Sequence, residues 1–248
     1  MHKLATIRTI GLAALLISAA PLRAQWTLDA EAGPVWSGYN DIRIPGQGGT
    51  LFSLSEDLKA DAGLFVRARL TWQFKPRHAL SVLYAPLKLT ASGAVGKDLA
   101  YNSEIFPAGT PLDARYIFNS YRLTYRYTLV QRERLRFGVG FTAKIRDAGI
   151  RVRGGGLSTE KTNVGFVPLI NFRLDWRLAE KLGLIFEGDA LAAPQGRAED
   201  VFLGLGYDLA KSVTLKAGYR VVEGGADNDE VYTFALVNYL SFGAIVRF

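Results

Sequence analysis

Charged side chains at alternate positions of apolar segments are the residues of this sequence that could carry chemistry. Ten of them form the candidate site: Arg67, Arg69, Arg122, Arg126, Lys144, Arg146, Glu187, Asp189, Lys216 and Arg220. Asp29, Glu31, Arg173 and Asp175 follow the same spacing. Successive side chains of an extended strand point to opposite faces, so residues two apart share a face. These charges are therefore predicted to line one polar face, opposite an apolar one.

A polar face of this kind, enclosed inside a barrel, could serve either of two functions. Both signs of charge are abundant, and desolvated charges have to be paired, so the side chains would fill the interior of a small closed barrel, which has just enough room for them. Alternatively, the excess of arginine and lysine would line a narrow, water-filled passage that favours anions. The filled lumen is the preferred prediction, and the anion-preferring channel is the alternative.

Histidine, the usual partner of a nucleophilic serine, is scarce. The chain contains only His2, in a predicted leader, and His78, which is predicted to be a solvated residue of a short turn. A serine without a base has no means of losing its proton at neutral pH. We therefore predict a protein that is not an enzyme, and a lipid-modifying enzyme is the third-ranked alternative.

Other motifs give weaker signals. Residues 223–230 carry four carboxylates but lack the spacing of a dedicated calcium loop, so a solvated outer loop is predicted. Gly154–Gly156 and the Gly204-x-Gly206 pair lack the spacing and the following helix of a phosphate or dinucleotide loop, and are assigned to turns and crowded inward positions. Basic residues alternate with apolar ones instead of forming an exposed stripe, which argues against nucleic acid. No metal or cofactor is predicted.

Alternation with a period of two extends along the chain and predicts ten strands. They cover about 26–39, 62–74, 79–92, 114–130, 135–147, 163–178, 182–191, 200–209, 213–223 and 232–248. Tight turns at 75–78, 131–134, 179–181 and 210–212 alternate with long polar connections at 40–61, 93–113, 148–162, 192–199 and 224–231. The pattern is typical of an up-and-down transmembrane β-barrel with ten strands, or eight if some segments do not span. Pro86 and Pro168 lack a donor, so bulges are expected there.

Aromatic residues gather beside the tight turns and the termini. They are Trp26, Trp72, Phe74, Tyr125, Tyr127, Phe137, Trp176 and Tyr207, with Trp36 and Tyr219 as a sparser second set. Aromatic belts mark the two interfaces of a membrane. A soluble sandwich has no reason to gather aromatics at one end of its exposed face.

The first 24 residues have the regions of a secretory signal peptide, with Lys3 and Arg8 before an apolar stretch from Ile10 to Ala20. Cleavage is expected after Ala24, or else after Ala20. The apolar stretch is too short for a membrane anchor. Removing this leader takes away three basic residues and no acid, which lowers the formal charge from +7 to +4. Residues 25–248 are predicted to form one domain, which contains no cysteine for a disulfide.

A signal peptide, alternating strands, turn asymmetry and a final Phe248 together resemble Gram-negative outer-membrane β-barrel proteins. The resemblance implies contacts with outer-membrane lipids and lipopolysaccharide, recognition of the C-terminal strand by the barrel-assembly machinery, and periplasmic termini. It leaves room for a protein partner in the envelope. In the last strand Phe242 and Phe248 are expected to face lipid, and Ser241 and Arg247 the lumen. Tyr239 breaks this alternation, which predicts a bulge in the outer half of the strand.

Overall fold

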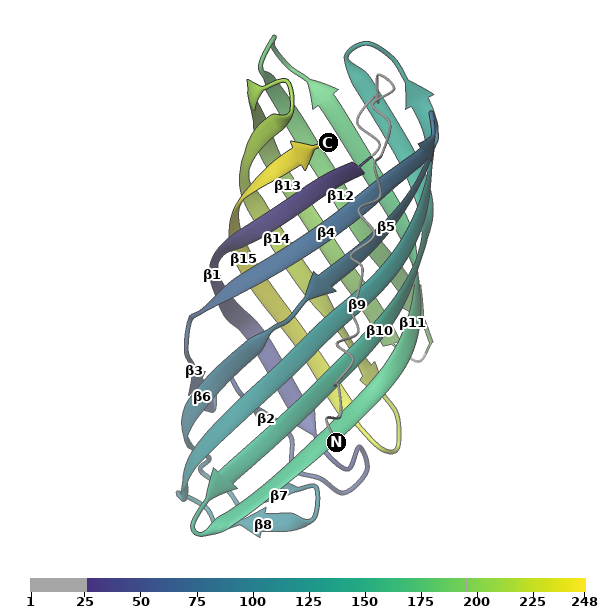
Figure 1. Cartoon of the computed structure of the whole chain (residues 1–248). Helices are drawn as coiled ribbons and strands as arrows, with labels where there is room; N and C mark the ends of the chain where they lie inside the picture. Colours follow the sequence, from purple (N-terminus) through teal and green to yellow (C-terminus); the bar gives the residue numbers. More distant parts are fainter. Residues whose placement is uncertain (1–25, 195) are drawn as a thin grey trace, which may run out of the picture.

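The computed structural model describes residues 26–194 and 196–248, which form a closed antiparallel β-barrel of ten strands (Figure 1). Its strands are β1 (Trp26–Arg43), β4 (Gly63–Lys75), β5 (His78–Ala85) continued by β6 (Lys88–Ala94), β9 (Pro111–Gln131), β10 (Leu135–Gly154), β11 (Leu157–Arg177), β12 (Leu182–Ala193), β13 (Gly196–Ala210), β14 (Val213–Asp227) and β15 (Tyr232–Arg247). Each pairs with its neighbours in the chain, and β15 closes the barrel against β1. The predicted ten-strand fold is confirmed. Within the described residues no helix is long and apolar enough to cross a membrane.

The two ends of the barrel differ. The short turns and the C-terminus lie at the upper end in Figure 1, where the backbone groups of Trp26 and Phe248 exchange two hydrogen bonds of 3.0 Å. The opposite end carries four short strands inside long connections: β2 (Phe52–Ser53), β3 (Leu58–Ala60), β7 (Leu99–Tyr101) and β8 (Glu104–Phe106). We call these the short-turn end and the outer end. The predicted signal peptide lies outside the described residues.

Three of the five connections predicted to be long are shorter than predicted, because the flanking strands extend into them. β10 and β11 extend to Gly154 and Leu157, so only a two-residue turn remains of the predicted connection 148–162. β12 ends at Ala193 and β13 begins at Gly196, and β14 extends to Asp227, while β15 begins at Tyr232 as predicted. The prediction was wrong because it looked for strands with apolar residues on the outer face. Nearer the short turns the apolar side chains do point outwards, but in these segments they do not.

The exchange of faces is clearest along β9. Towards the short turns, the inward positions Ser120, Arg122 and Thr124 are polar, whereas Tyr121, Leu123 and Tyr125 point outwards and are exposed. Towards the outer end, Leu112, Ala114 and Tyr116 are buried inside, and Asp113, Arg115 and Asn119 lie outside. One strand therefore suits lipid over one half of its length and water over the other. We call the level of residues 118–121 the inversion level.

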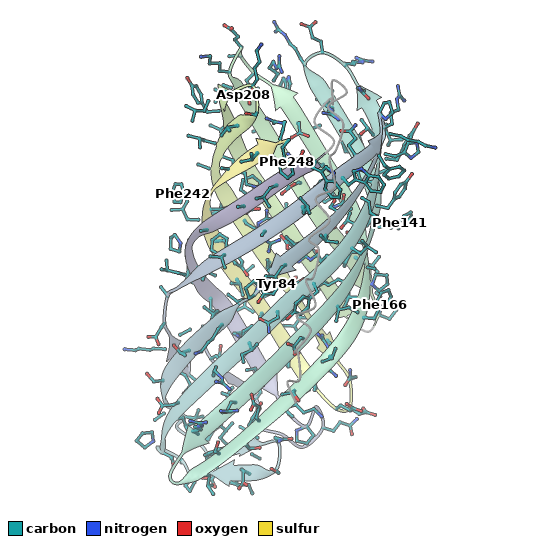
Figure 2. All side chains as sticks on the ribbon, in the orientation of Figure 1. Tyr84, Phe141, Phe166, Asp208, Phe242 and Phe248 are labelled. Atoms are coloured by element: carbon teal, nitrogen blue, oxygen red, sulfur yellow. The ribbon has the colours of Figure 1, made fainter. Side chains whose placement is uncertain are left out.

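Outside the barrel, an apolar belt occupies the half between the inversion level and the short turns. Figure 2 shows Phe141, Phe166 and Phe242 pointing away from the wall, and they are 69%, 64% and 52% exposed. At the short-turn edge of this belt Trp26 and Trp72 stack with ring centroids 5.8 Å apart. Trp36 and Tyr219 pair at 6.0 Å on the side of the inversion level. This arrangement matches two aromatic interfaces of a membrane.

The predicted bulge near Tyr239 is absent from β15. Tyr239 is 4% exposed and faces inwards, where its ring meets Phe65 edge-on at 4.9 Å. β14 and β15 stay in register throughout, and the register shift lies instead in β1, between Ser37 and Tyr39. Tyr239 lies in the outer half, where the inward side chains are apolar. The alternation of faces along β15 therefore continues without a break, and what changes along the strand is which face carries the apolar residues.

The two prolines behave differently. Pro86 falls in the gap between β5 and β6, so the predicted interruption is present there. Pro168 pairs with Ala143 in an unshifted ladder, and no bulge forms. The ladder between β11 and β12 begins only at Ile170. Pro168 therefore lies where β11 has no partner on its second side, and the missing donor leaves no ladder bond unmade.

Arginine placed on the outer face should distinguish the two halves of β9. Leu123→Arg puts a charge into the apolar belt and should lower the free energy of unfolding by about 2–4 kcal/mol, the cost of arginine near a bilayer midplane. Ile117→Arg, on the same face but on the outer-end side of the inversion level, should cost about 0–1 kcal/mol. Urea unfolding in phosphatidylcholine vesicles measures both. Equal losses would show that the belt does not end at the inversion level.

Candidate functional site

Twelve charged residues from seven strands meet inside the belt-covered half of the barrel. This charge network consists of Asp29 and Glu31 from β1, Arg67 and Arg69 from β4, Arg122 from β9, Arg173 and Asp175 from β11, Glu187 and Asp189 from β12, Asp200 from β13, and Lys216 and Arg220 from β14. Six are cations and six are carboxylates. Seven of the ten predicted site residues belong to it. Because charges buried in low dielectric need partners, equal numbers of each sign are what a filled lumen requires.

Arg220 is the centre of the network. Its guanidinium group donates to Asp200 Oδ1 at 2.6 Å, to Glu31 Oε1 at 2.7 Å and to Glu187 Oε1 at 3.2 Å. The residue is 1% exposed. A guanidinium group presents five donors in a planar fork, so it can serve three acids at once. The three acids come from three strands, and Arg220 holds them together.

Arg220 and Lys216 also share an aromatic partner. Their cationic groups lie 5.0 Å and 4.9 Å from the ring centre of Phe202, which points inwards from β13 and is fully buried. Gly204 and Gly218 make room for this ring, because a Cβ at Gly204 would lie 2.4 Å from Phe202 Cζ. The predicted role of Gly204 as a crowded inward position is confirmed. Buried cation–π contacts of this kind add to the ion pairs.

Asp200, Asp189 and Glu31 also have further partners. Asp200 accepts from Arg67 at 2.9 Å and from Arg122 at 2.6 Å, and Arg122 also reaches Asp189 at 2.6 Å. Neutral side chains complete the shell: Ser241 donates to Glu31 at 2.8 Å, and Thr142 and Asn171 donate to Asp189 at 2.6 and 2.8 Å. Buried ionic networks are stable only when their polar atoms are satisfied in this way.

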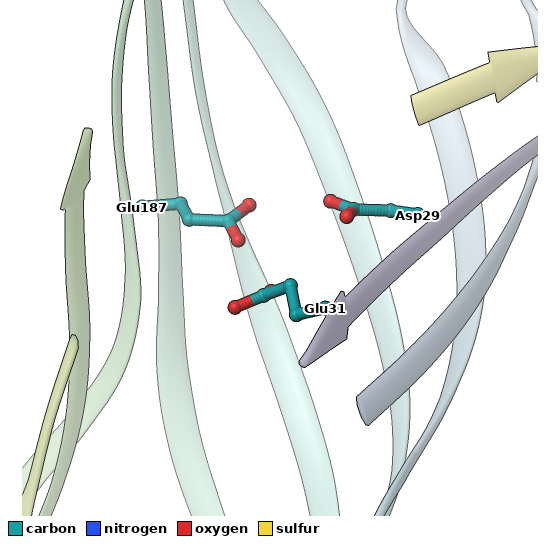
Figure 3. Close-up of side chains that lie close together, drawn as sticks. All are labelled: Asp29, Glu31 and Glu187. Carbon is teal, nitrogen blue, oxygen red and sulfur yellow. The ribbon is translucent and has the colours of Figure 1, made fainter. Parts of the chain in front are cut away.

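Three carboxylates of the network lie close enough to suggest a metal site. One oxygen each of Asp29, Glu31 and Glu187 falls within 4.8 Å of the others, and all three residues are buried (Figure 3). The ammonium group of Lys216, however, lies 2.6 Å from Asp29 and 3.0 Å from Glu31, and Arg69 reaches Glu187 at 3.0 Å. Side-chain cations therefore neutralise this triad, and the geometry favours ion pairing over a metal ion.

Three predicted site residues lie next to the network without joining its ion pairs. Arg126 donates one long hydrogen bond of 3.4 Å, to Asn171. Lys144 is 3% exposed, and its Nζ lies 4.7 Å from the ring centre of Phe118. Arg146 donates to Asn163. Within the described residues, none of these three cations lies within 4.0 Å of a carboxylate oxygen, so the lumen carries positive charge beyond the balanced network.

Sequence reasoning missed Asp200, which bonds to three arginines. Its alternation could have revealed it, because Phe202, Gly204 and Gly206 share its face while Val201 and Leu203 point outwards. Asp200 was overlooked because it lies at the first position of the predicted strand.

Towards the outer end, an apolar core blocks the lumen. It contains Val35, Ile42, Phe65, Leu87, Leu89, Leu112, Tyr116, Ile150, Val152, Val222, Val237 and Tyr239 from the barrel wall. Phe52, Leu58, Leu99, Tyr101 and Phe106 from the long connections complete it. Tyr101 meets Phe52 edge-on at 5.8 Å and donates to the carbonyl of Ile150 at 2.8 Å, which fastens the connections to the wall. Burial raises the pKa of Tyr101 above its ordinary value, so the phenol stays protonated as a donor.

Towards the short turns the lumen is open. A cavity of about 930 Å³ extends from the charge network to the turns. Small inward side chains such as Thr27, Thr71, Ala79, Gly138 and Gly206 line it, which is why it is not filled. The interior therefore has three layers: an open vestibule, a charge network whose nearest members line the vestibule floor, and an apolar core.

The other motifs have structural roles. His78 is at the short-turn end as predicted, but the expectation that it is solvated was wrong. It is half-buried, its Nδ1 lies 2.8 Å from Tyr125 Oη, and its ring packs on Tyr127. In the acidic segment 223–230, Glu223 binds Arg197 at 2.7 Å and Asp229 binds Gln47 at 2.6 Å, so the acids do not converge. Gly155 and Gly156 form the predicted turn, with φ of 57° and 84°.

A closed barrel with an apolar belt outside and paired charges inside is the fold of Gram-negative outer-membrane β-barrel proteins. Among solved structures, the chain is similar to the outer membrane protease OmpT from Escherichia coli, with 11% identity over 90% of this chain and 96% of that chain and a TM-score of 0.56. An outer membrane channel from Pseudomonas putida F1 shares 10% identity over 96% and 100% of the chains (TM-score 0.44). Ail, the attachment invasion locus protein of Yersinia pestis, shares 11% over 90% and 99% (TM-score 0.38).

No protein-family model matches the sequence, and no curated protein matches it. At 11% identity the likeness to OmpT shows a common fold and carries no activity with it.

Removing the central cation should destabilise the barrel strongly. Arg220→Met leaves Glu31, Glu187 and Asp200 without a shared partner and should lower the free energy of unfolding by about 3–5 kcal/mol, the cost of a broken buried pair. The matched control is Arg197→Met, because Arg197 pairs with Glu223 on the exposed outer face and should contribute at most about 1 kcal/mol. Urea unfolding in one lipid system compares them. Similar small losses would show that the network is solvated.

Proposed function

We propose that this protein is a non-enzymatic integral outer-membrane β-barrel that does not conduct and acts through its outer loops or as a subunit of an envelope assembly. The observation that carries the proposal is the closed lumen. A solute would have to break a network of twelve paired charges and then cross an apolar core sealed by β2, β3, β7 and β8. Apolar constrictions exclude water and ions.

The outer end offers a surface for contacts in place of a pore mouth. Its long connections are ordered by short strands, and Leu51 and Ile105 on them are 45% and 63% exposed, while Leu157 at the start of β11 is 36% exposed. Apolar side chains at the water-facing end of a folded cap have no lipid to cover them. Exposed apolar groups framed by polar residues are typical of protein-binding surfaces. They support a role in contact with a partner in the envelope.

The fold supports an outer-membrane location with both termini in the periplasm. Lipid and lipopolysaccharide would contact the belt and its outer edge, and the barrel-assembly machinery would recognise the strand ending in Phe248. His78 is the single histidine of the described residues, and its place in the aromatic girdle at the opposite end from the loops supports a non-enzymatic role. The narrow anion-preferring channel is the second candidate, favoured by the unpaired Arg126 and Lys144.

Electrical recording tests the closed lumen. The purified protein in planar bilayers should be silent at all moderate voltages, because opening a path would expose unpaired charges and apolar core. Insertion is verified separately by protection of the barrel from protease. Conductance that is lost when Arg122 and Arg126 are both changed to glutamine would contradict the proposal and establish the anion channel. A changed mass of lipid A or phospholipid on expression would instead establish an enzyme.

Crosslinking tests the outer surface. The chain contains no cysteine, so Ile105→Cys provides a single attachment point on the cap. Phe141→Cys is the matched control because Phe141 has similar exposure, 69% against 63%, but lies in the apolar belt. We expect a photo-crosslinker at residue 105 to trap one protein of defined mass in intact cells, and the control to trap none. Equal labelling at the two sites would exclude a specific contact through the cap.

A further inference from the structure

We propose that the vestibule at the short-turn end binds a soluble anion from the periplasm that carries at least two phosphate or carboxylate groups. The site is the cavity of about 930 Å³ between the charge network and the turns. It is distinct from the outer surface on which the proposed function depends. Pockets of several hundred cubic ångströms are of the size that encloses small ligands.

The first argument is the charge of the lining. Leaving aside the members of the charge network, eight arginine and lysine side chains line the vestibule, against three acids. Each of the four short turns contributes a cation to the mouth: Arg77, Arg134, Lys181 and Lys211. Low-dielectric walls lined by one sign of charge focus the field and concentrate ions of opposite sign. The ring at the mouth therefore attracts anions.

The second argument is the floor. Arg126 lines the vestibule next to the network and makes a single long hydrogen bond, at 3.4 Å to Asn171. Gly138 lies beside its stem, and a Cβ there would approach Arg126 Cγ to 3.1 Å. The guanidinium group thus has donors to spare at the closed end of the cavity. A planar guanidinium fork suits phosphate and carboxylate oxygens.

The third argument concerns access. The network and the apolar core seal the far side, so a ligand must enter and leave by the mouth between the turns. Cations lie at two levels of the vestibule, Arg126 at the floor and the four turn cations at the mouth. An anion with two charged groups can therefore bind at both levels at once. The barrel wall surrounds the cavity, which favours a soluble ligand over a lipid headgroup.

Calorimetric titration of the full barrel in zwitterionic detergent at low salt tests this site, with pyrophosphate and citrate as probes. We expect saturable one-to-one binding of at least one probe that weakens as salt rises. Arg136 also lines the vestibule, and the Arg126→Gln/Arg136→Gln double variant should bind at least about tenfold more weakly, the loss expected for charge-assisted hydrogen bonds. The Lys88→Gln/Lys97→Gln double variant removes the same charge from exposed positions in the outer half of the barrel and should stay within about twofold.

Three outcomes would overturn the proposal: no saturable binding by the unmodified protein, equal weakening in the control, or binding only of anionic phospholipid. The last is checked by repeating the titration in nanodiscs with and without phosphatidylglycerol. Should the first double variant fail to fold, Lys181→Gln/Lys211→Gln replaces it, because both residues lie on exposed turns. That variant should weaken binding by at least about threefold, and unchanged binding would count against the site.

Discussion

The pairing of charge inside the barrel is the constraint on which the rest of the structure depends. Six cations and six carboxylates meet inside the barrel, most of them buried, and an uncompensated charge among the buried ones costs several kcal/mol. Seven strands supply these groups, so the network can form only when all seven are in register. A slip of one residue would turn a strand's charges towards lipid and its apolar residues inwards. The network thus specifies the barrel as well as filling it.

The inversion level follows from the surroundings of each half. In the belt-covered half the outer face meets an apolar medium, so polar groups collect inside, as Arg122 and Thr124 do on β9. On the outer-end side of that level the arrangement is reversed: Asp113 and Arg115 face out, and Leu112 and Ala114 pack inside with the long connections. The outer half is organised like a water-soluble sheet packed on its own core. The barrel therefore has a polar interior and an apolar surface in one half, and an apolar interior and a polar surface in the other, and the same strands run through both halves.

The sequence could predict which face of each strand points inwards. It could not predict where the strands end towards the outer end, or which charged side chains meet across the lumen. Alternation located ten strands because lipid-facing residues are nearly all apolar within the belt. It failed at 148–162, where Ile150 and Val152 point inwards and Arg151 and Arg153 do not, a pattern that resembles a polar connection. It also read Tyr239 as an irregularity. The ion pairs could not be predicted, because Arg220 meets Glu31 across a sequence separation of 189 residues. Alternation shows which face a side chain is on, but not which side chain lies opposite it across the lumen.

The two ends of the barrel are built for different tasks. A pore would need both ends open and a polar path between them, yet here the lumen is closed twice, by charge pairs in the belt-covered half and by apolar packing towards the outer end. The short-turn end keeps its inward side chains small and its rim cationic, although larger residues there could have extended the core and closed it too. Filling that half with apolar side chains would have gained stabilising burial. A cavity retained beside a sealed network supports the two proposals made above, separate contacts at the two ends of the barrel and a lumen that does not conduct.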